Sequence, residues 1–299
     1  MPLFFFLSGL VFKPHFDKPF SVIVKKNIQQ LLVPYFLFAF ATYLFAILSQ
    51  QFSDVSLPSI GWQLFGILYG NGNDGMLGFN VILWFLPCLF ITRVTFAILT
   101  RKIKEKKYIG IALLFCGIIG YGISLFFPWM KLPYGFESAL TGLVFFGAGY
   151  LWKTRPSPLP FLRKYQVPII IFAVVLTLMA ASYNYHLNGA QIDLRINHLN
   201  NFFLFYIGAF GGIITWVAIS KLLAKNALLE YVGRHSMVIF AWHYLIFVNL
   251  QTVTGMILTD DFINSVKLVL PTLYVITAMT IILFSRLLIT KLKVALVKQ

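Results

Sequence analysis

Long apolar runs separated by short polar loops organise this sequence from end to end. After a first run at residues 1–12, eight more apolar segments follow at about 31–49, 81–99, 108–127, 137–152, 167–186, 201–220, 234–250 and 268–290. Each has about 16 to 23 residues, a length that suits a helix crossing the hydrocarbon core of a bilayer at some tilt. The pattern predicts an all-α, polytopic transmembrane helical bundle that forms one domain over residues 1–299.

The first run is shorter than the others. Twelve residues make about 18 Å of helix, whereas the hydrocarbon core is about 30 Å thick. The run does not fit a signal peptide, because no basic residue precedes it and no small-residue cleavage site closes it. We therefore expect Met1 to lie inside a transmembrane helix whose beginning is missing, so that nine segments are visible of an expected ten.

Composition supports this interpretation. The chain is 59% hydrophobic and 11% charged, with a mean hydropathy of +0.83, which excludes an ordinary soluble domain. Cys88 and Cys116 both fall inside apolar segments, which argues against a disulfide framework, and no metal-ligand spacing is present. We expect no metal cofactor.

The net charge of +15 is distributed unevenly between the loops. Alternate loops and the C-terminal tail hold 18 of the 24 basic residues, whereas the opposite loops hold only Lys131, Arg195 and Lys267. By the positive-inside rule, the side with 18 is cytoplasmic. This predicts a multi-pass protein of the plasma (inner) membrane, with Met1 outside and the C-terminus in the cytoplasm, and the charge requires no nucleic-acid partner.

Two loops have distinctive compositions. Residues 50–80 are rich in Gly, Asn and Ser and include Trp62 and Tyr69 in an apolar patch, which suggests a half-helix or lid at the outer interface. Residues 153–160 read as a Pro-rich cytoplasmic turn.

Several short motifs follow one another along the chain. They are MPLFFFLSG at 1–9 with LLVPYF at 31–36, LWFLP at 83–87, LPYGFESAL at 132–140 with FFGAGY at 145–150, NGAQIDLRIN at 188–197 before FY at 205–206, and VGRHSM at 232–237 with WH at 242–243. Each motif is weak alone. Their order and spacing resemble the acyltransferase-3 family of integral membrane O-acyltransferases, in particular its fucose 4-O-acetylase-like branch.

The resemblance implies an O-acetyltransferase. Such an enzyme takes an acetyl group from cytoplasmic acetyl-CoA and delivers it to a hydroxyl of an extracytoplasmic carbohydrate, either a surface polysaccharide or a glycolipid. The expected partners are therefore this acceptor, acyl-CoA and the lipid bilayer. The family's catalytic His lies on the helix that we expect to be missing, so the chain as written would be an incomplete enzyme.

Four residues are candidates on the outer side. Glu137 either complements the positive end of a helix dipole, or serves catalysis by binding sugar hydroxyls or orienting a base. Arg195 and Asn197 are either ordinary polar loop residues or contacts for the acceptor sugar. Trp84 is either an interfacial anchor or a platform on which a sugar stacks.

His243 is the second catalytic candidate. It is expected to lie about 14 Å along its helix, and ionisable groups at that depth usually face a cavity or a partner. The alternative is a neutral His that hydrogen-bonds a neighbouring helix.

On the cytoplasmic side, Lys25, Lys26 and Arg234 with His235 could hold the phosphates of coenzyme A, and Ser236 lies beside them. The alternatives are lysines that only set topology and a serine that only ends a helix. The family often has arginines where this chain has Gln29 and Gln30. Arg93 is expected to extend toward the cytoplasmic surface, and His15 to be a plain surface residue.

Two other functions remain open. A small proton-coupled transporter or flippase would use His243, although the sequence shows no paired inverted halves. A catalytically inactive acyltransferase relative would act as a structural or sensory partner.

Overall fold

The structure, a computed structural model, describes residues 1–50, 59–154, 165–223, 226–259, 265–266 and 269–297. Over these residues the chain is all-α without a strand, and an isolated antiparallel bridge joins Asp193 to His198. The helices are α1 (Pro2–Leu10), α2 (Phe20–Asn27), α3 (Val33–Gln50), α4 (Ile60–Tyr69), α5 (Phe85–Lys102), α6 (Lys106–Phe126), α7 (Phe136–Lys153), α9 (Gln166–Asn188), α10 (Phe202–Leu222), α11 (Ala227–Arg234), α12 (Ser236–Ile257) and α14 (Leu270–Val297).

The prediction of a polytopic membrane bundle is confirmed. Within the described residues, six helices are long and apolar enough to cross a bilayer: Phe20–Leu48, Val81–Lys102, Lys106–Phe126, Gln166–Leu187, Phe202–Leu222 and Ser236–Ile257. α1 and α7 coincide with the predicted runs at 1–12 and 137–152, but neither is among the six.

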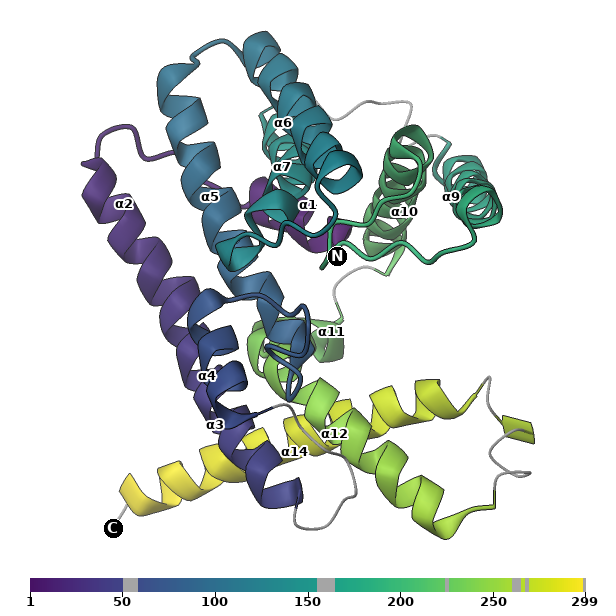
Figure 1. Cartoon of the computed structure of the whole chain (residues 1–299). Helices are drawn as coiled ribbons and strands as arrows, with labels where there is room; N and C mark the ends of the chain where they lie inside the picture. The colour runs from purple at the N-terminus through teal and green to yellow at the C-terminus, as the bar shows by residue number, and fades with distance from the viewer. Residues whose placement is uncertain (51–58, 155–164, 224–225, 260–264, 267–268, 298–299) are drawn as a thin grey trace.

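The predicted start of the second segment at residue 31 is wrong. One continuous rod runs from Phe20 to Gln50, with a π-helical turn, η1 (Ile28–Leu32), between α2 and α3 (Figure 1). Pro34 explains the π-turn, because a proline lacks an N–H and its ring clashes with the carbonyl four residues earlier, here that of Gln30. Lys25 and Lys26, which were expected in a loop, are therefore helical.

The predicted segment at 234–250 is also divided differently. α11 ends at Arg234, and α12 begins at Ser236 and continues to Ile257. The side chain of Asn226 starts α11 by accepting the backbone N–H groups of Leu228 and Leu229 at 2.9 and 3.1 Å.

α7 lies at the centre of one group of helices, packed against α1, α5 and α6. Glycines allow this close approach. A Cβ atom on Gly9 would lie 1.8 Å from the carbonyl oxygen of Phe146, and one on Gly149 would lie 2.0 Å from that of Phe6. Aromatic rings fill the contact, and the side chains of Phe5 and Phe146 are fully buried. α7 is thereby held as the scaffold for the residues at its N-terminus.

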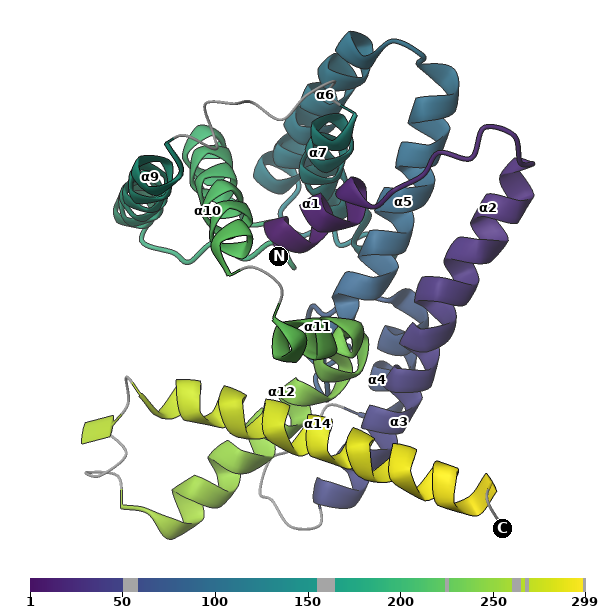
Figure 2. The same ribbon diagram turned by 180° about the vertical axis from the view of Figure 1, so that it is seen from behind.

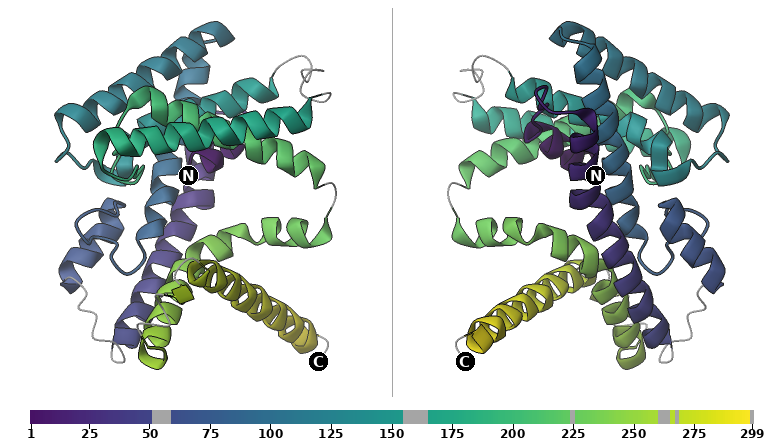
Figure 3. Two further views of the ribbon diagram at one scale, coloured as in Figure 1. Left: turned by 90° about the vertical axis from the view of Figure 1, so that its right-hand side faces the viewer. Right: turned by 90° about the vertical axis from the view of Figure 1, so that its left-hand side faces the viewer.

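The remaining helices form pairs. α9 packs on α10, and α14 packs on α12 (Figure 2). Seen from the sides, the α12–α14 pair extends away from the group around α7 (Figure 3). The loop expected at 50–80 contains α4, in agreement with the expected half-helix, and residues 51–58 of it lie outside the described residues. Most of the Pro-rich turn at 153–160 does so too.

Candidate functional site

Polar side chains gather near both ends of α5. Trp84, the last residue of the 3₁₀ turn η2 (Val81–Trp84), leads into the helix, and Arg101 lies in its last turn. The two residues are 17 positions apart, which corresponds to about 26 Å along a helix. A candidate site therefore has two parts, separated by a length close to the thickness of a hydrocarbon core.

The first part is named here the Glu137 cluster, and it consists of Asn71, Glu137, Asp193, Arg195 and Asn197. Glu137 stands in the first turn of α7, where a carboxylate complements the helix dipole. Its side chain is 1% exposed. The N–H of Leu132 donates to Glu137 Oε2 at 3.1 Å, whereas Glu137 Oε1 is buried without a hydrogen-bond partner in the described structure.

The turn before α7 brings other groups to Glu137. It is the 3₁₀ turn η3 (Pro133–Gly135), in which Tyr134 and Gly135 both have positive φ angles of 58° and 59°. Asn71 Nδ2 donates to the carbonyl oxygen of Leu132 at 3.1 Å, so the same residue that donates to Glu137 also accepts from the 70–80 loop.

Arg195 ties the 189–201 loop to this cluster. Its guanidinium pairs with Asp193 at 3.0 Å between Nη2 and Oδ2, and Nη1 donates to the carbonyl oxygen of Gly72 at 2.6 Å. Ser138, the residue after Glu137, donates from Oγ to the carbonyl oxygen of Arg195 at 3.3 Å. The backbones at Glu137 and Arg195 are thus neighbours, as the sequence-based hypothesis of a shared site requires.

The side chain of Asn197 makes structural hydrogen bonds. It is fully buried with a φ of 55°. Its Nδ2 donates to the carbonyl oxygen of Gly120 at 2.7 Å, and its Oδ1 accepts from Thr141 Oγ1 at 2.8 Å. These bonds join the loop to α6 and α7, so both ends of the amide already have protein partners.

Trp84 is buried and not exposed at the surface. Its side chain is 4% exposed, and its ring lies edge-on to Phe85 with the centroids 6.3 Å apart. Gly135 packs against the indole: a Cβ atom on that glycine would lie 3.8 Å from Trp84 Cε3. Stacking on a sugar would require Trp84 to be uncovered.

His243 lies on α12 and is half-buried. Its Nδ1 lies 2.9 Å from the carbonyl oxygen of Ile239 and 3.0 Å from that of Phe240. A carbonyl only accepts, so Nδ1 is the donor in these contacts, and in the neutral ring of that tautomer Nε2 would carry the lone pair. Phe240 packs near Phe85 at 5.7 Å between centroids, which places this face of α12 at the start of α5.

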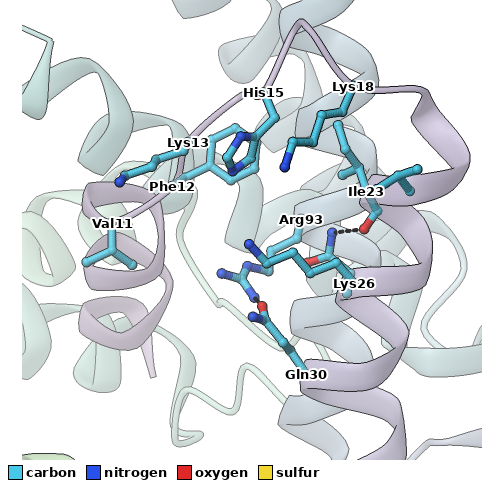
Figure 4. Close-up of a pocket in the computed structure, with 11 residues that line it drawn as sticks. Val11, Phe12, Lys13, His15, Lys18, Ile23, Lys26, Gln30 and Arg93 are labelled. Carbon is cyan, nitrogen blue, oxygen red and sulfur yellow. Dashed lines mark hydrogen bonds between the residues drawn. The ribbon is translucent and has the colours of Figure 1, made fainter.

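The second part is a basic pocket at the other end, lined by Val11, Phe12, Lys13, His15, Lys18, Val22, Ile23, Lys26, Asn27, Gln30 and Arg93 (Figure 4). Its volume is about 190 Å³. The residues come from the 11–19 loop, from the α2–η1 rod and from α5. Four are lysine or arginine and none of the described lining residues is acidic, so the pocket suits an anion.

Arg101 holds the loop that forms one wall of the basic pocket. Its Nη2 donates to the carbonyl oxygens of His15, at 3.5 Å, and of Lys18. The guanidinium also lies over the ring of Phe20, 5.6 Å from the centroid. Because Arg101 Nη2 donates to backbone carbonyls of the loop, Arg101 holds this wall of the pocket in place.

Of the residues predicted to bind the donor, the structure places one in the basic pocket and the others outside it. Lys26 lines the basic pocket, but Lys25, Arg234 and Ser236 do not. Arg234 donates to Glu230 Oε1 at 2.6 Å on its own helix, and Ser236 is an exposed residue at the start of α12.

Sequence reasoning missed four residues of the basic pocket. Lys13 and Lys18 were counted only as loop charges, His15 was expected to be plain surface, and Arg93 was expected to reach the membrane surface. A usable signal existed for Arg93: it is a charged residue in the middle of an apolar segment, where such residues mark functional sites.

The chain matches a known protein family. Residues 1–290 match the acyltransferase-3 family, described as an acyltransferase domain. No curated protein and no solved structure matches the chain.

Proposed function

Since this chain belongs to the acyltransferase-3 family and is a multi-pass membrane acyltransferase, we propose that it transfers an acetyl group from cytoplasmic acetyl-CoA to a hydroxyl of an extracytoplasmic carbohydrate. The acceptor is a surface polysaccharide or a glycolipid. The protein is proposed to lie in the plasma (inner) membrane with the basic pocket toward the cytoplasm.

One observation carries the proposal. The basic pocket and the Glu137 cluster lie toward opposite ends of the same helix, α5. A phosphate-bearing donor requires cations, which the pocket supplies. A carbohydrate hydroxyl requires hydrogen-bonding groups, which the cluster supplies. A transfer across the membrane needs these two chemistries on opposite sides, and α5 spans that distance.

The reaction itself needs a base and a leaving group. The acceptor hydroxyl oxygen attacks the thioester carbonyl carbon, a C–O bond forms, and the C–S bond breaks to release the thiol of coenzyme A. The hydroxyl proton passes to a general base, and the departing sulfur takes up a proton. The overall products are an O-acetyl ester and free coenzyme A.

Two residues are proposed to serve catalysis. With Nδ1 donating to backbone carbonyls, His243 Nε2 is the nitrogen that would take the hydroxyl proton when the imidazole is neutral. Glu137 Oε1 is a buried acceptor without a partner among the described residues, so it can hold the acceptor hydroxyl or orient a base. No hydrogen bond joins Glu137 to His243 in the part of the chain that is described.

The remaining roles follow the same division. Trp84, Arg195 and Asn197 are proposed to form the acceptor side, with Asn197 acting through the loop that it anchors. Lys26 is proposed to bind the donor phosphates, and the sequence-based assignment of Lys25, Arg234 and Ser236 to donor binding stays a prediction. Acetyl-CoA is the donor substrate, and no metal takes part.

The test compares a deletion strain with its parent. Both are grown with labelled acetate, and the label esterified to surface polysaccharide or glycolipid is measured after mild alkaline release. Loss of alkali-labile acetate, restored by the intact gene and not by a Glu137→Gln variant of equal abundance, supports the proposal.

Equal labelling in both strains contradicts it. In that case purified protein, reconstituted in vesicles with acetyl-CoA outside or inside, separates an inactive relative from an enzyme with another acceptor. Release of free thiol without any acceptor ester would indicate a different acyl acceptor.

A further inference from the structure

We infer that Arg93 is a ligand-binding residue of the basic pocket, and that its guanidinium, positioned by Gln30 on the π-turn, binds a phosphate group. This inference rests on the proposed function only for the identity of the ligand, coenzyme A. The phosphate chemistry follows from the pocket itself.

Arg93 stands midway along α5, nine positions after Trp84 and eight before Arg101. It is therefore about 12 Å along the helix from the end that Arg101 marks. Of the other cations of the pocket, Lys18 on the loop and Lys26 on α2 point their amines toward the space beside Arg93, whereas the amine of Lys13 points away from it (Figure 4). Arg93 thus lies at the inner end of the basic pocket, and the lysines line its outer end.

The guanidinium has unused hydrogen-bonding capacity. Its Nη1 donates to Gln30 Oε1 at 3.4 Å, which is a long contact to a neutral amide, and its Nε is buried without a partner among the described residues. Arginine carries five N–H donors, so most of them have no acceptor among the residues that the structure describes.

Three other arginines have partners of a different kind from that of Arg93. Arg195 and Arg234 each pair with a carboxylate, at 3.0 and 2.6 Å. Arg101 donates from Nη2 to backbone carbonyls, although its Nε, like that of Arg93, is buried without a partner among the described residues. A half-buried cation in an apolar helix is costly unless an anion accompanies it. None of the described pocket residues supplies that anion, so a bound ligand is the group that completes the site.

Phosphate fits this site better than a neutral ligand does. The guanidinium fork offers two parallel N–H groups to two oxygens of one phosphate, and the lysines add point charges around it. The volume of about 190 Å³ accommodates a phosphate or diphosphate group, with the rest of a nucleotide ligand extending past the loop. A membrane phospholipid presents the same group, so the experiment includes both sources.

Gln30 is a positioning residue. It reaches Arg93 because the π-turn places it on the side of the rod that faces α5. Without Gln30, the guanidinium would keep its charge and lose its orientation, so the affinity would fall by less than on removal of Arg93.

The test uses the purified full chain in nanodiscs of neutral phosphatidylcholine and measures the binding of coenzyme A, of 3′-dephospho-coenzyme A and of pyrophosphate. We expect Arg93→Gln to weaken coenzyme A binding at least about tenfold, Arg93→Lys to restore part of it, and Gln30→Ala to weaken it by a smaller factor. Lys102→Gln is the matched control, because it removes one exposed charge from the same helix outside the pocket.

Each outcome has a defined meaning. Unchanged coenzyme A affinity in a folded Arg93→Gln protein, together with unchanged binding of anionic phosphatidylglycerol, overturns the inference. A defect confined to phosphatidylglycerol nanodiscs assigns the phosphate to a lipid headgroup. Arg93-dependent coenzyme A binding without acetyl transfer supports the inference while contradicting the proposed function. The melting temperature of each variant checks that it is folded, and Arg93→Lys provides a second test if Arg93→Gln is unstable.

Discussion

Asn80 and Ala241 are joined by a buried hydrogen bond across 161 positions of sequence. Asn80 Nδ2 donates to the carbonyl oxygen of Ala241 at 2.8 Å, and the asparagine side chain is fully buried. Asn80 directly precedes η2, and Ala241 lies two residues before His243. This bond therefore fixes α12, and with it the proposed base, against the start of α5.

We expect Asn80→Ala to lower the free energy of unfolding by about 1–2 kcal/mol, because a buried donor is lost. Acetyl transfer should fall further than abundance does, since α12 also carries His243. Thermal melting in detergent measures the first effect. Asn249→Ala is the control, because the bond that its Nδ2 makes in the described part of the chain goes to the carbonyl oxygen of Leu245 on the same helix. Equal melting temperatures for the two variants would contradict this role of Asn80.

Gly9→Ala should destabilise the packing of α1 on α7. The added Cβ atom would lie 1.8 Å from the carbonyl oxygen of Phe146, and a backbone atom cannot move aside as a side chain can. Overpacking of this kind costs about 1–3 kcal/mol or more. The control is Gly122→Ala on α6, where nothing lies within 4 Å of the new atom. A Gly9 variant as stable as the Gly122 variant would show that α1 does not pack as described.

Glu137→Gln should lower acetyl transfer by at least about tenfold while leaving abundance in the membrane unchanged. Glutamine has nearly the same shape, and its carbonyl oxygen can still accept the N–H of Leu132. Only the carboxyl chemistry is removed. Activity and abundance are measured on the same membranes, and full activity would exclude a catalytic role for this carboxyl.

Asn197→Ala should reduce abundance and stability rather than only the affinity for the acceptor. The variant loses the bonds to Gly120 and Thr141, and alanine is less tolerant than asparagine of a φ near 55°. The expected loss is about 2–4 kcal/mol. A stable variant with a raised KM for the acceptor would instead establish direct contact with the sugar.

The orientation is checked by cysteine labelling in a background without Cys88 and Cys116. Single cysteines at Asp74 and Asp193 should react with an impermeant reagent from outside, and one at Lys104 only after the membrane is opened. The reason is the uneven distribution of basic residues between the loops. Labelling of all three from the same side would contradict the topology.

The lengths of the apolar runs were enough to predict a bundle of membrane helices, because a run of about 20 apolar residues is typical of a membrane-spanning helix. It could not find where each helix ends. The rod that begins at Phe20 includes a polar stretch around Lys25 and Lys26, which hydropathy assigns to a loop. The helical propensity of those residues and the continuity with α3 decide the matter, and a hydropathy pattern does not report either.

The candidate site was predicted in part. Glu137 and Arg195 were expected together and their backbones are neighbours, because both follow from loop positions on one side. The basic pocket was not predicted, because it depends on a loop folding back over α5. The bonds from Arg101 to the carbonyls of His15 and Lys18 hold the loop in that position. No local sequence pattern predicts these bonds. The catalytic and binding roles of the site residues stay predictions.

The π-turn at Ile28–Leu32 also sets the angular phase between the two halves of the rod. A π-turn contains one residue more than an α-helical turn, and one residue corresponds to about 100° of rotation about the axis. Deleting Gln29 would let an ordinary helix form and would turn α2 by roughly that angle relative to α3. Lys26 and Asn27 would then leave the basic pocket while Tyr35 and Ala39 stayed in the core. A single-residue deletion could thus disconnect the anion site from an otherwise intact bundle.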